Sequence, residues 1–202
     1  MSVLVDRDIL EAIERGAIII TPFSRRCLGT NSYDVHLAST LRVYKRMIER
    51  VRPYASAWTK DQDTPLDVRA PREMYDIEIA GDGFVLEPGE LYLASTVEHT
   101  ESHEHVPMLN GRSSLGRLGL SIHVTAGTGD VGFRGHWTME LFVIKRLRVY
   151  PGIPIGQLLW FSTEGWPLVT YDHKLSAKYN NAGALPQPSR LHLELEPNPK
   201  DG

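Results

Sequence analysis

The sequence has little cysteine, little net charge and no long apolar run. Its one cysteine, Cys27, excludes an internal disulfide and any zinc site built from two or three cysteines, and it fits a reducing compartment. A formal net charge of −3 gives no overall basic field for nucleic acid, so any anion site has to be built locally. No apolar stretch approaches the ~20 residues of a membrane span. MSVLVDRDIL also lacks the cationic and apolar regions of a signal peptide. We therefore expect a cytoplasmic protein with neither nucleic acid nor membrane as a partner.

Short apolar alternations separated by turn residues are abundant in the 202 residues. The length fits a single domain, 1–202, with a sizeable core. Asp6 to Gly16 predicts an N-terminal helix within 1–16, with Asp6 as its cap and Gly16 as its stop. Strands are predicted at Ala17–Thr21, Tyr33–Leu37, Leu41–Tyr44, His136–Ile144 and Ile155–Phe161, with a hairpin of 84–86 and 91–94 around Pro88–Gly89. This pattern is typical of a mainly β sandwich or barrel with few helices.

Two polar segments interrupt this pattern. Residues 45–76 contain Pro53, Pro65 and Pro71, and we interpret them as an irregular excursion that covers a site or decorates an interface. Residues 174–202 form a polar tail, and its composition leaves a frayed terminus and an ordered segment equally open.

The segment from Gly111 to Arg117 concentrates groups that bind phosphate. Arg112 and Arg117 can each present a planar fork of donors, and Ser113 and Ser114 add small hydroxyls. Composition alone favours a solvated loop here. The flanking glycines and the apolar strand that follows favour an anion site.

Glu140 lies on a predicted strand in an otherwise apolar setting. Alternation along that strand places Glu140 on the face of Thr138 and Phe142, where a carboxylate is costly to bury unless it is hydrogen-bonded or functional. Taken alone, Glu140 fits an edge charge or a partner for an arginine. Asp130, between glycines, fits a turn residue. His123 and His136 are candidate bases, but lone histidines near a core are usually structural.

Taken in order, several motifs resemble those of dCTP deaminases, in the trimeric dUTPase superfamily. They are SYDVHL, GRSSLGRLGL, HVTAG, the Asp130–Gly132 turn, FRG, TMEL, PGIPIGQL and Tyr171 followed by AlaLysTyr. The resemblance covers nearly the whole chain and implies a dUTPase-like distorted β-barrel or jelly roll. It also implies a homotrimer with sites shared between subunits, and a tail, 174–202, that closes over bound nucleotide.

The resemblance further implies roles for individual residues. Glu140 would be the general acid and base that removes the cytosine amino group of dCTP, giving dUTP and ammonia. Ser113, Arg117 and the main-chain carbonyl of Ala126 would surround the attacking water. Asp130 would bind the sugar and Phe133 would pack against it. The other implied nucleotide contacts are Arg112, Ser114, Leu115, Gly116, Thr138, Met139, Gln157, Tyr171 and Lys178.

No acidic cluster with metal-binding spacing is visible, so we expect Mg²⁺ to arrive on the triphosphate and no zinc to be needed. The resemblance also makes dTTP a candidate feedback inhibitor. Gly129-Asp130-Val131-Gly132 departs from the Ile-Asp-Pro-Gly of many deaminases, and a glutamine expected shortly after Tyr179 is missing.

Alternatives to the simple deaminase stay open. Thr125–Gly127, Ile155–Gln157 and the Pro-Gln-Pro-Ser ending are similar to the bifunctional branch, which continues from dUTP to dUMP and pyrophosphate. A plain dUTPase would have an apolar residue in place of Glu140. A catalytically silent nucleotide-binding regulator is disfavoured because Glu140, Arg117 and Ser113 are all present.

Overall fold

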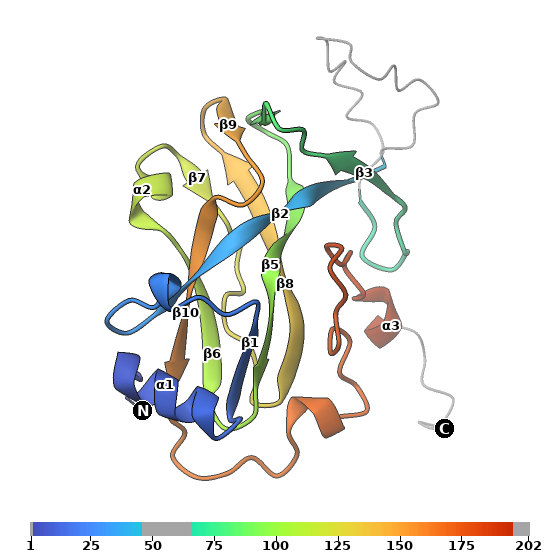
Figure 1. Cartoon of the computed structure of the whole chain (residues 1–202). Helices are drawn as coiled ribbons and strands as arrows, with labels where there is room; N and C mark the ends of the chain where they lie inside the picture. The colour runs from blue at the N-terminus through green and yellow to red at the C-terminus, as the bar shows by residue number, and fades with distance from the viewer. Residues whose placement is uncertain (1, 46–65, 196–202) are drawn as a thin grey trace, which may run out of the picture.

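The computed structural model describes residues 2–45 and 66–195, and its architecture is mainly β (Figure 1). Within these ranges the helices are α1 (Asp6–Glu14), α2 (Ser113–Gly116) and α3 (His192–Leu195), with 3₁₀ turns at Arg25–Cys27 and Tyr171–His173. The strands are β1 (Ile18–Thr21), β2 (Tyr33–Tyr44), β3 (Met74–Glu78), β4 (Phe84–Leu86), β5 (Tyr92–Ser102), β6 (Val106–Gly111), β7 (Leu120–Ser121), β8 (Phe133–Val143), β9 (Leu147–Val149) and β10 (Pro154–Phe161). The predicted fold class is confirmed.

One large sheet carries most of the strands. Its order is β6-β10-β2-β5-β8-β7, with β1 added to β5 and β3 added to β2, and all the pairings are antiparallel. The sheet wraps around its own interior like an incompletely closed barrel, and α1 lies at one end (Figure 1). None of the helices within 2–45 and 66–195 has the length and apolar character needed to cross a bilayer.

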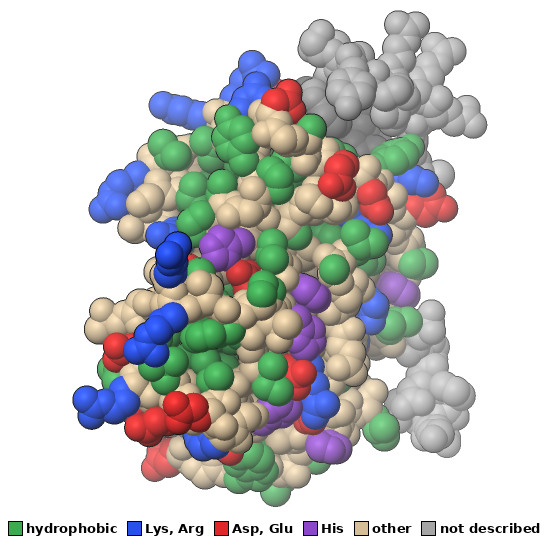
Figure 2. Space-filling model, viewed as in Figure 1, with side chains coloured by type: hydrophobic (Ala, Val, Ile, Leu, Met, Phe, Trp, Pro, Cys, Tyr) green, Lys and Arg blue, Asp and Glu red, His purple; other side chains and the backbone are tan. Residues whose placement is uncertain are grey.

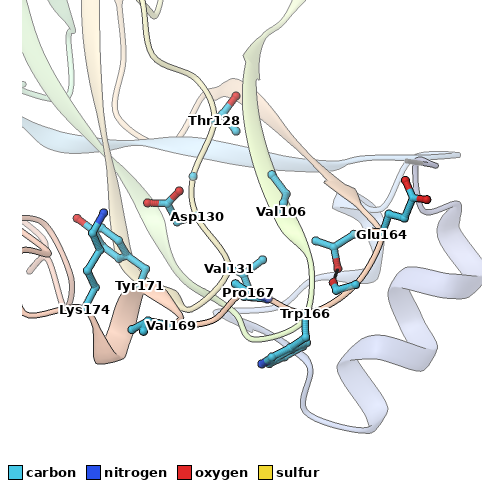
Figure 3. Close-up of a pocket in the computed structure, with 13 residues that line it drawn as sticks. Val106, Thr128, Asp130, Val131, Glu164, Trp166, Pro167, Val169, Tyr171 and Lys174 are labelled. Atoms are coloured by element: carbon cyan, nitrogen blue, oxygen red, sulfur yellow. Dashed lines mark hydrogen bonds between the residues drawn. The ribbon is translucent and has the colours of Figure 1, made fainter.

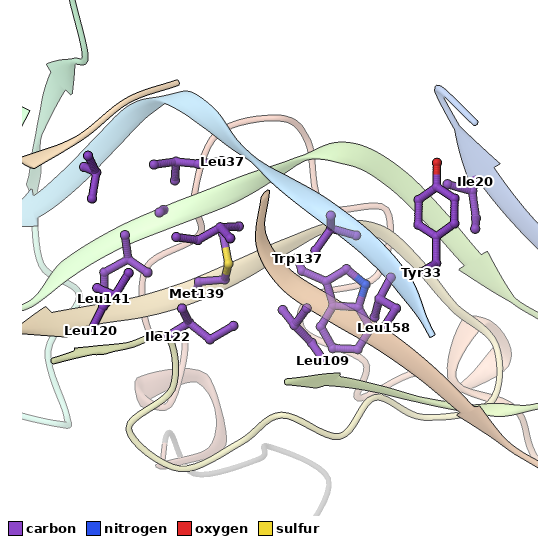
Figure 4. Close-up of a cluster of buried hydrophobic side chains, with 14 of the residues drawn as sticks. Ile20, Tyr33, Leu37, Leu109, Leu120, Ile122, Trp137, Met139, Leu141 and Leu158 are labelled. Carbon is purple, nitrogen blue, oxygen red and sulfur yellow. The ribbon is translucent and has the colours of Figure 1, made fainter. Parts of the chain in front are cut away.

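Alternation along the strands builds the core and decides which side chains face outward. On β8, Trp137, Met139 and Leu141 are buried, and they pack with side chains of β2, β6 and β10 (Figure 4). Burying each of these large apolar side chains contributes ~1.5–3 kcal/mol. The intervening residues Thr138 and Glu140 therefore lie on the outer face of β8.

A bulge in the middle of β5 bends the sheet. The register of β5 against β8 shifts between Ser95 and His99, and here the Thr96 hydroxyl accepts a hydrogen bond from the Trp137 N–H at 3.0 Å. The buried Glu98 carboxylate accepts bonds from the His36 N–H at 2.8 Å and from His36 Nδ1 at 2.6 Å. These bonds satisfy the polar groups that the interrupted ladder would otherwise leave unpaired.

The predicted hairpin around Pro88–Gly89 is wrong. Strand β4 pairs with β9 in a separate two-stranded sheet, with Leu86 opposite Leu147. Leu86 is fully buried in the core, so its long-range packing, and not the nearby turn, selects the strand that it pairs with. The two strands predicted at 33–37 and 41–44 are one strand, β2, whose pairing with β5 shifts register between Leu37 and Leu41.

At the N-terminus, Val5 and not Asp6 is the cap of α1, and Asp6 is the first helical residue. The Asp8 carboxylate accepts the Val5 N–H at 3.2 Å, so an acid in the first turn supplies the bond that we had assigned to Asp6. The glycine stop is as predicted, since Gly16 has a φ of 74° just after the helix.

Most of the expected excursion at 45–76, namely 46–65, lies outside the described residues. At its end the prediction of irregular chain is wrong, because β3 begins at Met74 and pairs with the end of β2, with Tyr44 opposite Met74. The next residues along both strands, Lys45 and Glu73, form an ion pair of 2.8 Å.

Candidate active site

A cavity of about 440 Å³ lies on the outer face of β8. Its lining comes from β8 and the turn before it, from the end of β2, from the start of β5 and from the C-terminal segment, so it joins regions that are far apart in the sequence. Six of the residues predicted for the site line it: Ala126, Asp130, Phe133, Thr138, Glu140 and Tyr171.

Glu140 reaches this cavity with one carboxylate oxygen unpaired. Its side chain is 30% exposed, and its Oε2 atom is buried without a hydrogen-bond partner among the described residues. The nearest basic atom is His123 Nδ1, at 3.7 Å. His123 Nε2 donates to the Leu109 carbonyl at 2.7 Å, because a carbonyl can only accept, and so in the neutral ring Nδ1 has no proton to give Glu140. An incoming water or amino group could satisfy this oxygen.

The turn before β8 is built around two glycines. A Cβ on Gly129 would lie 2.7 Å from the Trp137 ring, and Gly132 has a φ of 92°, so neither position accepts a larger residue easily. Between them, the Asp130 side chain lines the cavity, and its carbonyl accepts the Phe133 N–H at 3.1 Å. The departure from Ile-Asp-Pro-Gly thus still forms a tight turn that presents Asp130.

Aromatic rings form one side of the cavity. The Phe133 ring lies 4.6 Å from the Trp137 ring and 6.5 Å from the Tyr171 ring, measured between centroids. The Tyr171 hydroxyl accepts the Tyr179 N–H at 3.0 Å, so the C-terminal segment fixes one of these rings. Such flat apolar walls suit a sugar or a base.

The arginine-rich segment lies elsewhere. Arg112 directly precedes α2 and forms an ion pair with Asp34 of β2, and Gln157 of β10 donates to the same carboxylate at 3.1 Å. None of Arg112–Arg117 and Gln157 lines the Glu140 cavity. In Figure 2, several Lys and Arg side chains lie along the left edge of the face, the side that carries α2 in Figure 1, whereas the C-terminal segment is on the right. One chain therefore does not bring these two groups of predicted residues together.

The side chains of two further predicted site residues make contacts within the chain and do not line the Glu140 cavity. The Met139 side chain is fully buried in the core, and Met139 does not line the cavity. Lys178 forms an ion pair with Glu194.

The other lining residues were not assigned to the nucleotide site from the sequence, although His136 was considered as a base. They are Tyr44, Leu91, Leu93, Thr128, Gly129, His136, Trp137, Tyr179, Ala182, Gln187, Pro188 and Ser189. The alternation of β8 could have indicated His136, and the AlaLysTyr motif could have indicated Tyr179.

A second cavity, of about 480 Å³, lies between the Asp130 turn and the loop from Thr163 to Lys174 (Figure 3). It shares Thr128, Gly129, Asp130 and Tyr171 with the first cavity. In Figure 3 the Asp130 carboxylate lies on the side of Tyr171 and Lys174. In the parts of the chain that the structure describes, no three His, Cys, Asp or Glu side chains are grouped so as to hold a metal ion.

Comparison with known proteins identifies the family of this chain. Residues 3–163 match the family model described as dCTP deaminase-like. A Clostridium botulinum (strain Alaska E43 / Type E3) protein named "dCTP deaminase, dUMP-forming" is 41% identical over 96% of this chain and 99% of its own length. A Hathewaya histolytica protein of the same name is 42% identical over 89% of this chain and 91% of its own.

Among solved structures, the fold is similar to 2'-deoxycytidine 5'-triphosphate deaminase from Agrobacterium tumefaciens. The TM-score is 0.57 at 19% identity, and the match covers 80% of this chain and 48% of that one. The similarity in sequence to the curated relatives, over nearly their whole length, is what decides the family. The chain belongs to the dCTP deaminase-like family.

Proposed function

We propose that the protein hydrolyses dCTP to dUTP and ammonia and then hydrolyses the dUTP to dUMP and pyrophosphate. The observation that carries the deamination is Glu140, which brings an unpaired, buried carboxylate oxygen into a cavity of nucleoside size. The second step is supported by the relatives that are about 40% identical, whose names describe them as dUMP-forming.

The proposed chemistry needs one group that accepts a proton and later returns it. Glu140 would take a proton from a water as that water attacks C4 of cytosine, and it would then protonate the departing ammonia. Ala126 lines the same cavity, and its main-chain carbonyl would accept a hydrogen bond from the second hydrogen of the water. Asp130 and Phe133 also line the cavity, and they would bind the sugar with a hydrogen bond to a hydroxyl and a flat apolar contact.

We propose that the active assembly is a homotrimer in which a neighbouring copy supplies the phosphate donors. Among the residues that the structure describes, no arginine or lysine lines the Glu140 cavity, although its proposed ligand has about four negative charges. The predicted phosphate donors lie away from that cavity, at the edge of the molecule that carries α2. They are Arg112, Ser113, Ser114 and Arg117. A second copy that places this edge over the cavity would complete the site, and a closed ring is how such repeated contacts are normally satisfied.

In this proposal Mg²⁺ enters on the triphosphate and neutralises part of its charge, since Mg²⁺ commonly binds through substrate phosphates. A cytoplasmic location and inhibition by dTTP stay predictions from the sequence.

Incubating the protein with dCTP and Mg²⁺, and resolving dUTP from dUMP while ammonia is measured, tests the function directly. We expect one ammonia per dCTP, with dUMP and pyrophosphate as the accumulating products. Accumulation of dUTP would limit the activity to deamination. Turnover of dUTP without any of dCTP would indicate a dUTPase, and binding without turnover of either would indicate a regulator.

Activity should survive exhaustive treatment with a zinc chelator once Mg²⁺ is restored. The single cysteine cannot build the usual zinc-deaminase site, and Glu140 provides the proton transfer in its place. The measurement is turnover of dCTP together with the zinc content of the protein. One zinc per chain, and activity restored by zinc alone, would contradict the proposed mechanism.

A further inference from the structure

The C-terminal segment returns to the start of β8 and is bonded to it. Ala182 forms a parallel bridge with Gly135, and its carbonyl accepts the His136 N–H at 3.1 Å. The Arg134 carbonyl accepts the Asn181 N–H at 2.8 Å, and the Arg134 N–H donates to Asn180 Oδ1 at 3.2 Å. Both main-chain polar groups of Arg134 therefore hold this segment.

The Arg134 side chain holds a second part of the same segment. Its guanidinium donates to the Asp172 carboxylate, whose side chain is only 10% exposed. The Thr170 hydroxyl donates to that carboxylate too, and His173 Nδ1 lies 3.2 Å from it. The Thr170 hydrogen bond is the main reason that the pKa of Asp172 is below its usual value, with His173 and Arg134 contributing. Asp172 is thus charged at neutral pH, and its bond to Arg134 is charge-assisted.

Further bonds connect Asp172 to the covering of the Glu140 cavity. Its neighbour Tyr171 accepts the Tyr179 N–H, and the Tyr179 hydroxyl accepts the Arg190 N–H at 2.9 Å. The Arg190 guanidinium donates to Gln187 Oε1 at 2.9 Å and lies 5.7 Å from the Tyr179 ring. Gln187 in turn donates its N–H to Thr138 Oγ1, on the outer face of β8, at 2.9 Å.

We infer that Arg134 is a positioning residue that holds residues 171–189, the C-terminal cover, over the Glu140 cavity and thereby sets the affinity for nucleotide. This inference rests on the proposed function of the cavity. Arg134 itself does not line the cavity, so it acts through Asp172 and the main chain of 180–181. A cover that is ordered before binding spares the nucleotide the entropic cost of ordering it.

A KM-against-kcat comparison tests the inference. For Arg134→Gln we expect the KM for dCTP to rise about tenfold, as loss of one charge-assisted bond allows, with kcat changed less than about threefold. Arg134→Lys should recover part of the loss because it restores the charge without the planar fork. The matched control is Arg146→Gln, which removes an exposed arginine paired with Glu87 and outside both cavities.

Amide hydrogen exchange of residues 179–190 in the nucleotide-free protein provides a readout that does not depend on turnover. Exchange there should accelerate in Arg134→Gln and stay at the wild-type rate in Arg146→Gln. Unchanged exchange, or a fall in kcat at constant KM, would overturn the inference.

If Arg134→Gln does not fold, Asp172→Asn removes the same contact from the other side, with the same expectations. If the wild-type protein does not act on dCTP, the proposed function fails. Hydrogen exchange then still decides whether Arg134 orders the cover.

Discussion

Glu140→Gln is expected to abolish deamination while nucleotide binding stays close to that of the wild type. The amide keeps the size of the carboxylate but cannot take a proton from water and return it to ammonia. Loss of a general acid or base alone costs ~10²–10⁴-fold in rate, and because Glu140 has both roles we expect the upper end of that range or beyond. Ammonia release measures the chemistry, and titration with dCTP measures the binding.

The matched control is Glu78→Gln, since Glu78 is also a glutamate on a strand but is exposed on β3 and bonded to Thr40. Its activity should equal that of the wild type. Deamination by Glu140→Gln within tenfold of the wild type would remove Glu140 from the mechanism. Weak binding together with lost turnover would instead assign it to the recognition of substrate.

Mixing two inactive variants should restore activity if the site is shared between copies. Arg112→Ala removes a phosphate donor and Glu140→Gln removes the acid and base, and in the structure these residues lie in different places on one chain. After the two variants are unfolded and refolded together, about one in four interfaces of a randomly mixed trimer should contain both intact residues. We therefore expect recovery of roughly a quarter of the wild-type activity, measured as ammonia release.

The control mixture combines Arg112→Ala with Arg117→Ala, which both remove donors of the same segment. It should recover less activity than the first mixture, because the phosphate-donor segment of every chain then lacks either Arg112 or Arg117. If the first mixture remains inactive although mixed trimers form, Arg112 and Glu140 serve the site of the same chain. The shared site would then be abandoned.

The sequence by itself determined what depends on neighbouring residues. Alternation between Trp137 and Val143 predicted that Glu140 shares a face of β8 with Thr138 and Phe142, and the structure has this arrangement. Which of the two faces is buried was not predicted. The period of two is a property of the extended backbone, so it can be recognised without knowing which strands lie beside it. Gly16 at the end of the first helix was predictable for another local reason, because glycine adopts the positive φ of a helix stop without strain.

The motifs also indicated the family, because their order along the chain is itself a sequence property. They could not show that Arg112 and Glu140 would lie apart, although only 27 positions separate the two numbers. Strand β6 lies beside β10 at one end of the sheet order, and Arg112 directly after it pairs with Asp34 of β2. Strand β8, which carries Glu140, lies on the other side of β5. Which edge a residue reaches depends on sheet order, which no local pattern encodes.

Only the tertiary structure decided the partner of β4 and the path of the C-terminal segment. Strand β4 pairs with β9 because Leu86 is buried in the shared core, and a turn signal at Pro88–Gly89 cannot report that packing. The bonds from residues 180–182 to 134–136 form only once β8 has been placed. Such contacts join residues far apart in sequence, and their free energy depends on the completed core, so composition left the order of this segment open.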